Sequence, residues 1–264
     1  MEVLTPRTLD EALRLKAERP DARPLAGGTD LLVELNFDRA RPEAILNLEE
    51  VHELRGWSRE NGAVRLGARL TYTEAMAPEL AELLPALAEA SRTVGSPQIR
   101  NRGTIGGNLG TASPAGDALP PLLVRGAEVE VASVRGERRL SLEEFLVGPK
   151  RNALAEDELV VAVRAQPPGD GRETFMKVGP RNAMVIAVCS LAVAVDEEAG
   201  EIRAAYGSAG PVPALVRAPL AERGSFPELV AEACSPIDDV RGTAAYRRHA
   251  LRVLAERGLE RLLV

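Results

Sequence analysis

The chain has 264 residues, of which 45% are hydrophobic and 27% are charged, and this composition indicates a folded protein with one large domain or two smaller ones. Its formal net charge of −6 argues against a nucleic-acid binder, because contact with a phosphate backbone needs an excess of clustered Lys and Arg. The two cysteines, Cys189 and Cys234, lie far apart in the sequence, so the chain does not supply the ligand set of an iron–sulfur cluster or a structural zinc ion.

The sequence carries no signal for export or membrane insertion. Its first residues lack the basic and apolar regions of a signal peptide, and no run of about 18 apolar residues is available to span a bilayer. We therefore expect a cytoplasmic protein without a membrane span.

The first fifty residues alternate short strands and helices. Thr8 and Glu11 have the spacing of a capping box, which predicts that a helix begins at Leu9. Thr29 and Asp30 are expected to cap a second, short helix, whose N-terminal dipole favours an anion nearby. The expected elements are a strand over 2–4, a helix from 9, a strand leading into 25, a helix to 35 and a strand over 44–48.

The next stretch contains one long amphipathic run and one long polar segment. Leucines at helical spacing predict a single helix over 78–94 that ends at Gly95. Residues 96–117 are rich in Gly, Pro, Ser and Asn, and such irregular segments are usually functional. The other expected elements are a strand over 63–67, a helix over 119–125, a strand over 128–134, a turn capped by Ser141 and a strand over 158–163.

A domain boundary is expected at residues 165–171, which combine two prolines with two glycines. It divides the chain into residues 1–165, with subdomains of about 1–52 and 53–165, and residues 172–264. In the second part, 173–179, 185–196 and 201–208 are predicted antiparallel strands, and 243–263 is a predicted amphipathic helix.

Two segments with paired glycines carry the strongest functional signal. They lie at 25–32 and 104–110, and both lack the lysine of a P-loop. Paired glycines flanked by hydroxyl and amide side chains let backbone N–H groups approach a phosphate. Two such segments in one chain indicate a ligand with two phosphates held from two sides, and a dinucleotide is the natural candidate.

Four ordered motifs resemble the flavin-binding medium subunit of the molybdenum hydroxylases, the family of carbon monoxide dehydrogenase and xanthine dehydrogenase. They are Ala26-Gly27-Gly28-Thr29-Asp30, Thr104–Asn108 together with 111–117, residues 177–181, and residues 239–248. The resemblance covers essentially the whole chain. It implies an α+β fold, in which an FAD-binding domain of the vanillyl-alcohol oxidase and p-cresol methylhydroxylase (PCMH) type, made of two α+β subdomains, precedes a smaller C-terminal α/β domain.

The resemblance also implies the residues that bind FAD. The segment 25–32 receives the pyrophosphate, the segment at Thr104 contacts it from the other subdomain, and Asp117 accepts hydrogen bonds from ribityl or neighbouring hydroxyls. Lys177, one of only three lysines among the 33 basic residues, approaches the cofactor from the C-terminal domain. The full set is Leu25, Ala26, Gly27, Gly28, Thr29, Asp30, Leu31, Leu32, Val94, Thr104, Ile105, Gly106, Gly107, Asn108, Thr111, Asp117, Val160 and Lys177.

The same resemblance implies partners and a role. The expected partners are a large molybdopterin-binding subunit and a small subunit with two [2Fe–2S] clusters, in a dimer of heterotrimers. Electrons pass from the clusters through FAD to an external acceptor. No residue of this chain is assigned as an acid–base or covalent catalyst or as a metal ligand.

Two other functions stay open at this point. A free-standing flavoenzyme needs a His or Cys bound to the flavin or a base near its reactive nitrogen, and neither His52 nor His249 has such a context. A flavin-free scaffold is the other alternative, and the intact glycines count against it. The individual motifs also have plainer explanations: each glycine pair as a turn, Asp117 as a helix cap and Lys177 as a solvated side chain.

Overall fold

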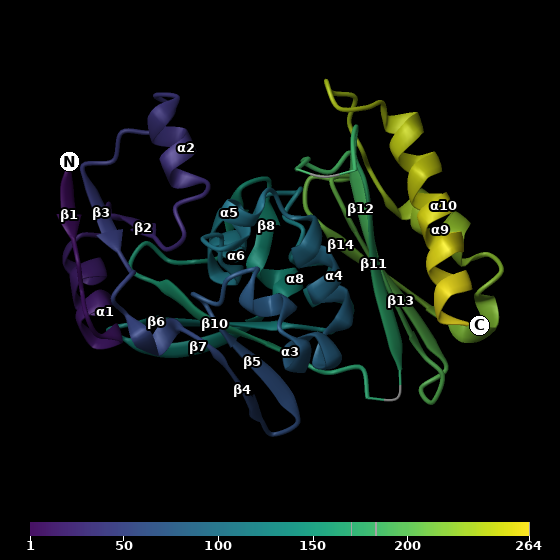
Figure 1. The fold of residues 1–264 in the computed structure, drawn as a ribbon, viewed down its shortest axis with the longest axis horizontal. Coiled ribbons are helices and arrows are strands. Elements are labelled where there is room, and N and C mark those ends of the chain that lie inside the picture. Colours follow the sequence, from purple (N-terminus) through teal and green to yellow (C-terminus); the bar gives the residue numbers. More distant parts are fainter. Residues whose placement is uncertain (170, 183, 264) are drawn as a thin grey trace.

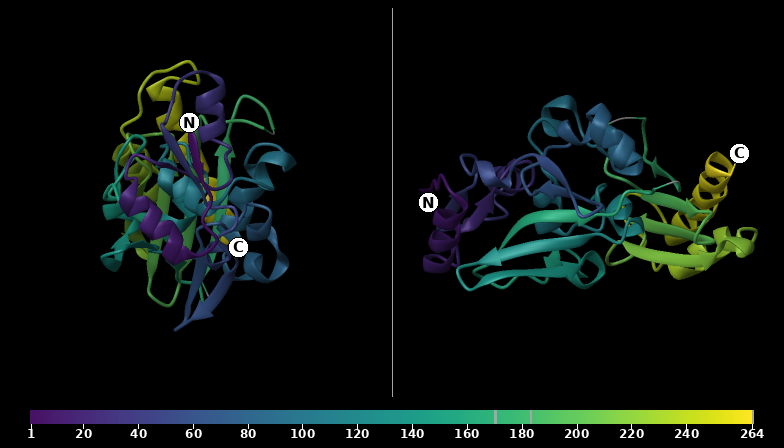
Figure 2. Two further views of the ribbon diagram at one scale, coloured as in Figure 1. Left: turned by 90° about the vertical axis from the view of Figure 1, so that its left-hand side faces the viewer. Right: turned by 90° about the horizontal axis from the view of Figure 1, so that it is seen from below.

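The computed structural model describes residues 1–169, 171–182 and 184–263. The molecule is elongated, with the N-terminus and the C-terminal helix at opposite ends and three larger sheets between them (Figure 1, Figure 2). None of the helices in these residues combines the length and the apolar character needed to cross a bilayer.

The first sheet is parallel, and it carries the first paired-glycine segment. Its subdomain contains β1 (Glu2–Leu4), α1 (Leu9–Glu18), β2 (Arg23–Leu25), α2 (Leu31–Asn36) and β3 (Ala44–Asn47). The strand order is β1-β3-β2, and the helices provide the crossovers that parallel strands need. Thr8 caps α1 as predicted, because its hydroxyl accepts from the amide of Glu11. The second half of the predicted capping box is displaced by one residue, since the Glu11 carboxylate accepts from the amide of Arg7.

The second sheet is antiparallel, and its central strand is fully buried. It contains β4 (Trp57–Glu60), β5 (Ala63–Gly67), β6 (Glu128–Ser133), β7 (Gly136–Ser141) and β10 (Leu159–Ala165), in the order β4-β5-β10-β6-β7. All seven residues of β10 are buried. The edge strands β4 and β7 were not predicted, because apolar and polar residues do not alternate along them. In β7, for example, Glu137, Arg138 and Arg139 are all exposed.

Six short helices lie between these strands along the chain. They are α3 (Pro78–Leu83), α4 (Pro85–Thr93), α5 (Pro97–Arg100), α6 (Ile105–Thr111), α7 (Leu119–Val124) and α8 (Leu142–Phe145). Of these, α6 and α8 pack on the second sheet, whereas α4 and α7 pack on the third sheet described below. The single helix expected over 78–94 is therefore wrong, because Leu84 precedes Pro85 and takes a non-helical conformation. The irregular structure expected for 96–117 is also wrong, since this segment contains α5 and α6. Ser141 and Glu144 form the expected capping box of α8.

The third sheet is antiparallel, with helices on both faces. It contains β11 (Arg172–Val178), β12 (Cys189–Asp196), β13 (Glu201–Gly207) and β14 (Ala214–Pro219), paired in that order. The helices α9 (Phe226–Ala233) and α10 (Ala244–Leu262) pack on one face (Figure 1). Side chains alternate along β12, so that Leu191 and Val193 join the core beneath α10, whereas Ala192 and Ala194 join the core of residues 1–165.

We propose that residues 1–165 and 172–264 are two domains, as the expected boundary divides them. The division is supported by the sheets, because no strand of the third sheet pairs with a strand of the other two in the described residues. Within the boundary, Asp170 lies outside the described residues.

A buried polar contact fixes the third sheet against α4. The Glu173 carboxylate, on β11, accepts from the amide of Ala86 at 2.9 Å and pairs with Arg125 Nε at 2.8 Å. One turn further along α4, the Glu89 carboxylate accepts from Thr174 Oγ1 at 2.8 Å and from the Phe175 amide at 2.6 Å. The position of β11 is therefore set by α4, which matters for Lys177 below.

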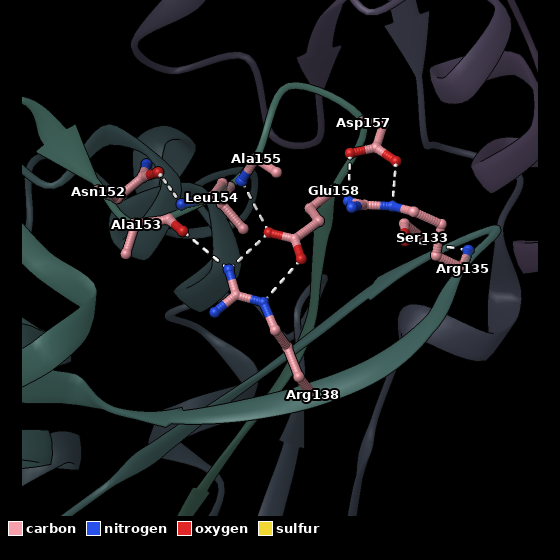
Figure 3. A network of polar contacts seen from close by, with 9 residues as sticks. All are labelled: Ser133, Arg135, Arg138, Asn152, Ala153, Leu154, Ala155, Asp157 and Glu158. Atoms are coloured by element: carbon pink, nitrogen blue, oxygen red, sulfur yellow. Dashed lines mark hydrogen bonds and ion pairs between the residues drawn. The ribbon is translucent and has the colours of Figure 1, made fainter.

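A second polar network holds the loop that leads into β10. This loop follows the hairpin of β8 (Leu146–Gly148) and β9 (Arg151–Asn152). The Glu158 carboxylate accepts from Arg138 Nε and Nη2, both at 2.7 Å, and from the Ala155 amide at 2.7 Å (Figure 3). Asp157 pairs with Arg135 through two further hydrogen bonds (Figure 3). The loop is thus fixed by charge-assisted hydrogen bonds at two successive residues.

Removing one partner of the buried ion pair is expected to destabilise the protein strongly. In the variant Arg125→Ala, the Glu173 carboxylate stays buried without its cation, which costs about 3–5 kcal/mol. The matched control is Arg217→Ala, because Arg217 and its partner Glu143 are 51% and 49% exposed and such a pair contributes less than about 1 kcal/mol. Urea unfolding measures both losses, and equal losses would contradict the assignment.

The network around Glu158 predicts a specific pH dependence. The Arg138 hydrogen bonds lower the pKa of Glu158 below its ordinary value, although partial burial opposes the shift. The stabilisation is therefore complete above about pH 4.3, where a free glutamate titrates, and is lost as the pH falls through the lowered pKa. We expect the difference in unfolding free energy between wild type and Glu158→Gln to shrink as the pH falls from about 6 to about 3.

The exposed Glu82 provides the control for this measurement. Its replacement by Gln should leave the stability unchanged across the same range. A difference between wild type and Glu158→Gln that stays constant with pH would rule out the stabilising role of the ionised Glu158.

Candidate functional site

A cavity of about 470 Å³ lies where the first sheet meets α6. Three segments that are distant in the sequence form its walls: the turn between β2 and α2, one side of α6, and the loop at 152–160 that Figure 3 shows from close by. The cavity is within the size range of small-molecule sites.

The turn between β2 and α2 is shaped by the two glycines of the first segment. A Cβ atom added to Gly27 would lie 1.8 Å from the carbonyl oxygen of Arg102, so only glycine allows this approach of two backbones. Gly28 has a φ of 77°, which side chains rarely adopt. Within the described residues, the amides of Gly27, Gly28 and Thr29 donate to no protein acceptor. Three free N–H groups in a turn that lines a cavity are suited to an anion.

The expected helix cap at this turn is wrong. Asp30 occupies the N-cap position of α2, but its backbone is already helical and its side chain caps no amide. Its carboxylate instead accepts from Thr111 Oγ1 at 2.8 Å. This contact joins the first glycine segment to the end of α6.

The second glycine segment, 104–110, forms the N-cap and most of α6 and is not a loop. Thr104 is the N-cap of α6 and accepts from the amide of Gly107. The amides of Ile105 and Gly106 donate to the carbonyls of Leu70 and Ala68, so these amides are not free for a phosphate. A Cβ atom at Gly106 would lie 2.5 Å from the Ala68 carbonyl oxygen, which explains this glycine by protein packing. Gly106 and Gly107 both line the cavity, but a Cβ atom at Gly107 would meet only the hydroxyl of Thr104 and no backbone.

Asn108 presents a buried oxygen that no protein group satisfies. It lines the cavity from the next position of α6, and its Oδ1 has no hydrogen-bond partner in the described part of the chain. Near the end of the same helix, Asn152 Nδ2 donates to the carbonyl of Gly110 at 2.7 Å. A buried amide oxygen without a donor favours a ligand that carries one.

A second cluster forms around a buried ion pair. Lys177 Nζ, on β11, lies 2.5 Å from Asp117 Oδ2, and the two side chains are 5% and 10% exposed. Lys177 also donates to the carbonyl of Thr93, which places Val94 beside the pair. Burial raises the pKa of Asp117, and the Lys177 ammonium opposes the shift. Asp117 Oδ1 is buried without a partner in the described residues, so it can accept a further hydrogen bond.

Tyr72 connects the cavity to this pair. Its side chain is buried and lines the cavity. Burial raises its pKa, and the carboxylates of Asp117 and Asp30 both add to the shift. Tyr72 is therefore within electrostatic range of the cavity and of the ion pair, which places the two features in one region of the molecule.

The structure brings most of the expected residues together. The cavity is lined by Leu25, Ala26, Gly27, Gly28, Thr29, Asp30, Leu31, Thr104, Gly106, Gly107, Asn108, Thr111 and Val160. Val94, Asp117 and Lys177 form the second cluster. Two expected residues lie elsewhere: Leu32 is 47% exposed on α2, because the residues after Asp30 turn away with the helix, and Ile105 is buried in the core.

Other lining residues were not expected. Tyr72, Asn152, Lys16 and Lys150 all line the cavity. The rarity of lysine was the one available signal, and it applied equally to Lys16, Lys150 and Lys177; only the family resemblance singled out Lys177. Tyr72 and Asn152 had no local signal, since they reach the cavity only through the packing of segments distant in sequence.

Comparisons with known proteins support a flavoprotein. Residues 1–165 match the family model described as the FAD binding domain in molybdopterin dehydrogenase. The xanthine dehydrogenase FAD-binding subunit of Escherichia coli O157:H7 is 31% identical over 269 residues, covering 95% of this chain and 91% of the relative. The carbon monoxide dehydrogenase medium chain of Hydrogenophaga pseudoflava is 28% identical over 274 residues, covering 98% and 95%.

A solved structure agrees with these relatives. The structure is that of carbon monoxide dehydrogenase from Hydrogenophaga pseudoflava lacking the Mo-pyranopterin moiety of its cofactor, and it superposes with a TM-score of 0.92 at 26% identity, covering 100% of this chain and 97% of that chain. The expected fold class and FAD as the cofactor are thereby confirmed. The chain belongs to the family of the FAD-binding domain in molybdopterin dehydrogenase, and it is an FAD-dependent oxidoreductase subunit.

Proposed function

We propose that this chain is the electron-transfer subunit of a molybdenum hydroxylase and holds FAD with its pyrophosphate against the turn between β2 and α2. The observation that carries the proposal is the row of free amides at Gly27, Gly28 and Thr29 on the wall of the cavity. Backbone N–H groups bind phosphate oxygens without the cost of ordering long side chains. FAD supplies the redox chemistry, and the protein supplies its binding and orientation.

The remaining contacts follow from the buried atoms that lack partners. Asn108 and the side of Gly107 face the cavity from α6 and contact the cofactor opposite the turn. Asp117 Oδ1 accepts from a hydroxyl of the ribityl chain or its neighbour, while Lys177 holds the other carboxylate oxygen. Val94 and Val160 provide apolar contacts. Neither His52 nor His249 lines the cavity, so nothing favours a covalently bound flavin or a histidine base in it.

The proposed assembly contains two partner subunits. A large subunit binds molybdopterin, and a small subunit carries [2Fe–2S] clusters whose electrons reach the FAD of this chain and leave for an external acceptor. Support comes from the relatives, several of which are named as medium chains or subunits of dehydrogenases. We propose a dimer of such heterotrimers in the cytoplasm, where Cys189 and Cys234 remain free thiols as in the structure.

Blocking the cavity at Gly107 is expected to abolish flavin retention while the chain stays folded. A Cβ atom at Gly107 meets only Thr104 Oγ1, at 2.9 Å, so Gly107→Val costs at most the helix cap, about 1 kcal/mol. Its methyl groups occupy space on the cavity wall. Visible absorbance and release of FAD by denaturation measure the stoichiometry, which we expect to be about one per chain in the wild type.

Two matched glycine variants separate binding from folding. Gly224→Val places the same side chain in open space and should retain FAD. Gly106→Val forces a side chain into the Ala68 backbone and should lower the thermal stability itself. Full FAD content in a folded Gly107→Val protein would refute the assignment of this cavity.

The partners are tested separately from the cofactor. A tagged copy of the chain, expressed in its native host, should bring down a large chain containing molybdenum and a small cysteine-rich chain containing iron, because this chain lacks their ligand sets. Metal analysis and electron paramagnetic resonance of the purified complex identify both. Recovery of the chain alone, as a homo-oligomer that turns over a substrate, would favour a free-standing flavoenzyme.

A further inference from the structure

The cavity of about 470 Å³ that is proposed above to hold FAD is called the flavin cavity here. A second cavity, of about 370 Å³, adjoins it on the other side of the first glycine segment. The two cavities share Ala26, Gly27, Arg69 and Thr104 as lining residues. None of the residues assigned above to the ribityl chain or the ion pair lines the second cavity. Gly27, whose amide is assigned above to the pyrophosphate, lies in the wall between the two cavities, and the proposed function uses no other residue of the second one.

Three arginines in this cavity surround a single carboxylate. Arg102 makes two hydrogen bonds to Glu49, at 3.0 and 3.3 Å, and Arg69 Nη2 lies 3.2 Å from the same carboxylate. Arg55 approaches it at 3.8 Å. One carboxylate cannot neutralise three guanidinium groups. The other acidic residue of the lining, Glu74, does not pair with them, because its carboxylate accepts hydrogen bonds from the amide and the hydroxyl of Thr71. The lining therefore has a positive excess, although the chain as a whole carries a formal charge of −6.

An unsatisfied donor gives independent evidence. Arg69 is 7% exposed, and its Nε–H is buried without an acceptor in the residues that the structure describes. Its other nitrogens bind the carboxylate and the carbonyl oxygen of Glu49. A buried N–H group without a partner is costly, so a bound acceptor would offset that cost.

We propose that this second cavity, lined by Arg55, Arg69 and Arg102 and called the arginine-lined cavity below, binds a small oxyanion. The oxyanion is phosphate or the phosphate group of a small phosphorylated molecule. Guanidinium groups bind phosphate oxygens in pairs, and the hydroxyl of Thr104 and the side-chain amide of Asn101 add further donors to the lining. The volume leaves room for a small organic group on the phosphate. The site is separate from that of the flavin pyrophosphate and shares only a wall with it.

The test uses the FAD-loaded protein and isothermal titration calorimetry at constant ionic strength. The probes are inorganic phosphate and glycerol 3-phosphate, and the wild type should bind both saturably. Tighter binding of glycerol 3-phosphate identifies a phosphorylated molecule as the ligand, and equal affinities identify the free ion. The test variant is Arg102→Gln, because Arg102 is 55% exposed and its replacement leaves the backbone contact with Gly27 in place.

We expect Arg102→Gln to weaken phosphate binding by about tenfold to about a hundredfold, the usual loss for hydrogen bonds to a charged group. Arg55→Gln, a second partly exposed member of the cluster, should weaken it in the same direction. The control Arg59→Gln removes an exposed arginine from neighbouring β4 and should leave the affinity unchanged. FAD content should stay at the wild-type level in all three variants.

Three results would overturn the proposal. The first is a wild type that binds neither probe saturably. The second is equal binding by wild type, Arg102→Gln and Arg55→Gln, which would leave only an adventitious ion elsewhere on the surface. The third combines two observations: Arg102→Gln loses FAD, and phosphate binds only to protein from which FAD has been removed. Together they would assign these arginines to the flavin pyrophosphate. Retention of FAD by Gly224→Val and loss by Gly107→Val would still test the flavin site independently.

Discussion

The candidate site depends on one close contact between two backbones. Gly27 lies against the carbonyl of Arg102 so closely that no side chain fits between them, and Gly103 in turn lies against the ring of Tyr72. This contact presses the turn between β2 and α2 onto the segment that enters α6. The turn is fixed from that side, and its amides, which donate to no acceptor within the described residues, belong to residues that line the cavity. The contact also forms the wall between the flavin cavity and the arginine-lined cavity.

Glycine patterns in the sequence could locate this site but could not say what approaches each glycine. The pairs at 27–28 and 106–107 predict close approach equally well. In the structure, Gly27 is approached by the backbone of Arg102 and Gly106 by that of Ala68, whereas a Cβ atom at Gly107 would meet only the hydroxyl of Thr104. The difference lies in the packing of distant segments, and no local pattern records it. For the same reason, the first turn of α6 was expected to be a loop.

The helices and strands were predictable where local pattern decides their structure, and not where the packing of distant segments decides it. Strands with buried residues, such as β10 and β12, were predictable because tertiary packing and local pattern agree there. Edge strand β7 pairs through its backbone while its polar side chains face solvent, so its sequence resembles a loop. The break between α3 and α4 arises from one proline, Pro85, whose effect on Leu84 outweighs the leucine periodicity. The pairing of Asp117 with Lys177 spans sixty residues and was implied only by the family resemblance, which placed both residues near the cofactor.

The two cavities would bind phosphate by different physical means. The flavin cavity is lined by four basic residues, Lys16, Arg23, Arg69 and Lys150, and by four acidic ones, Asp30, Glu34, Glu156 and Glu158, so its charges balance. Attraction there must come from backbone dipoles in a partly enclosed space, which salt screens weakly. The arginine-lined cavity has a charge excess and exposed guanidinium groups, and its attraction is the kind that salt weakens. A cofactor that must stay bound through many turnovers suits the first arrangement, and an anion that exchanges with solution suits the second.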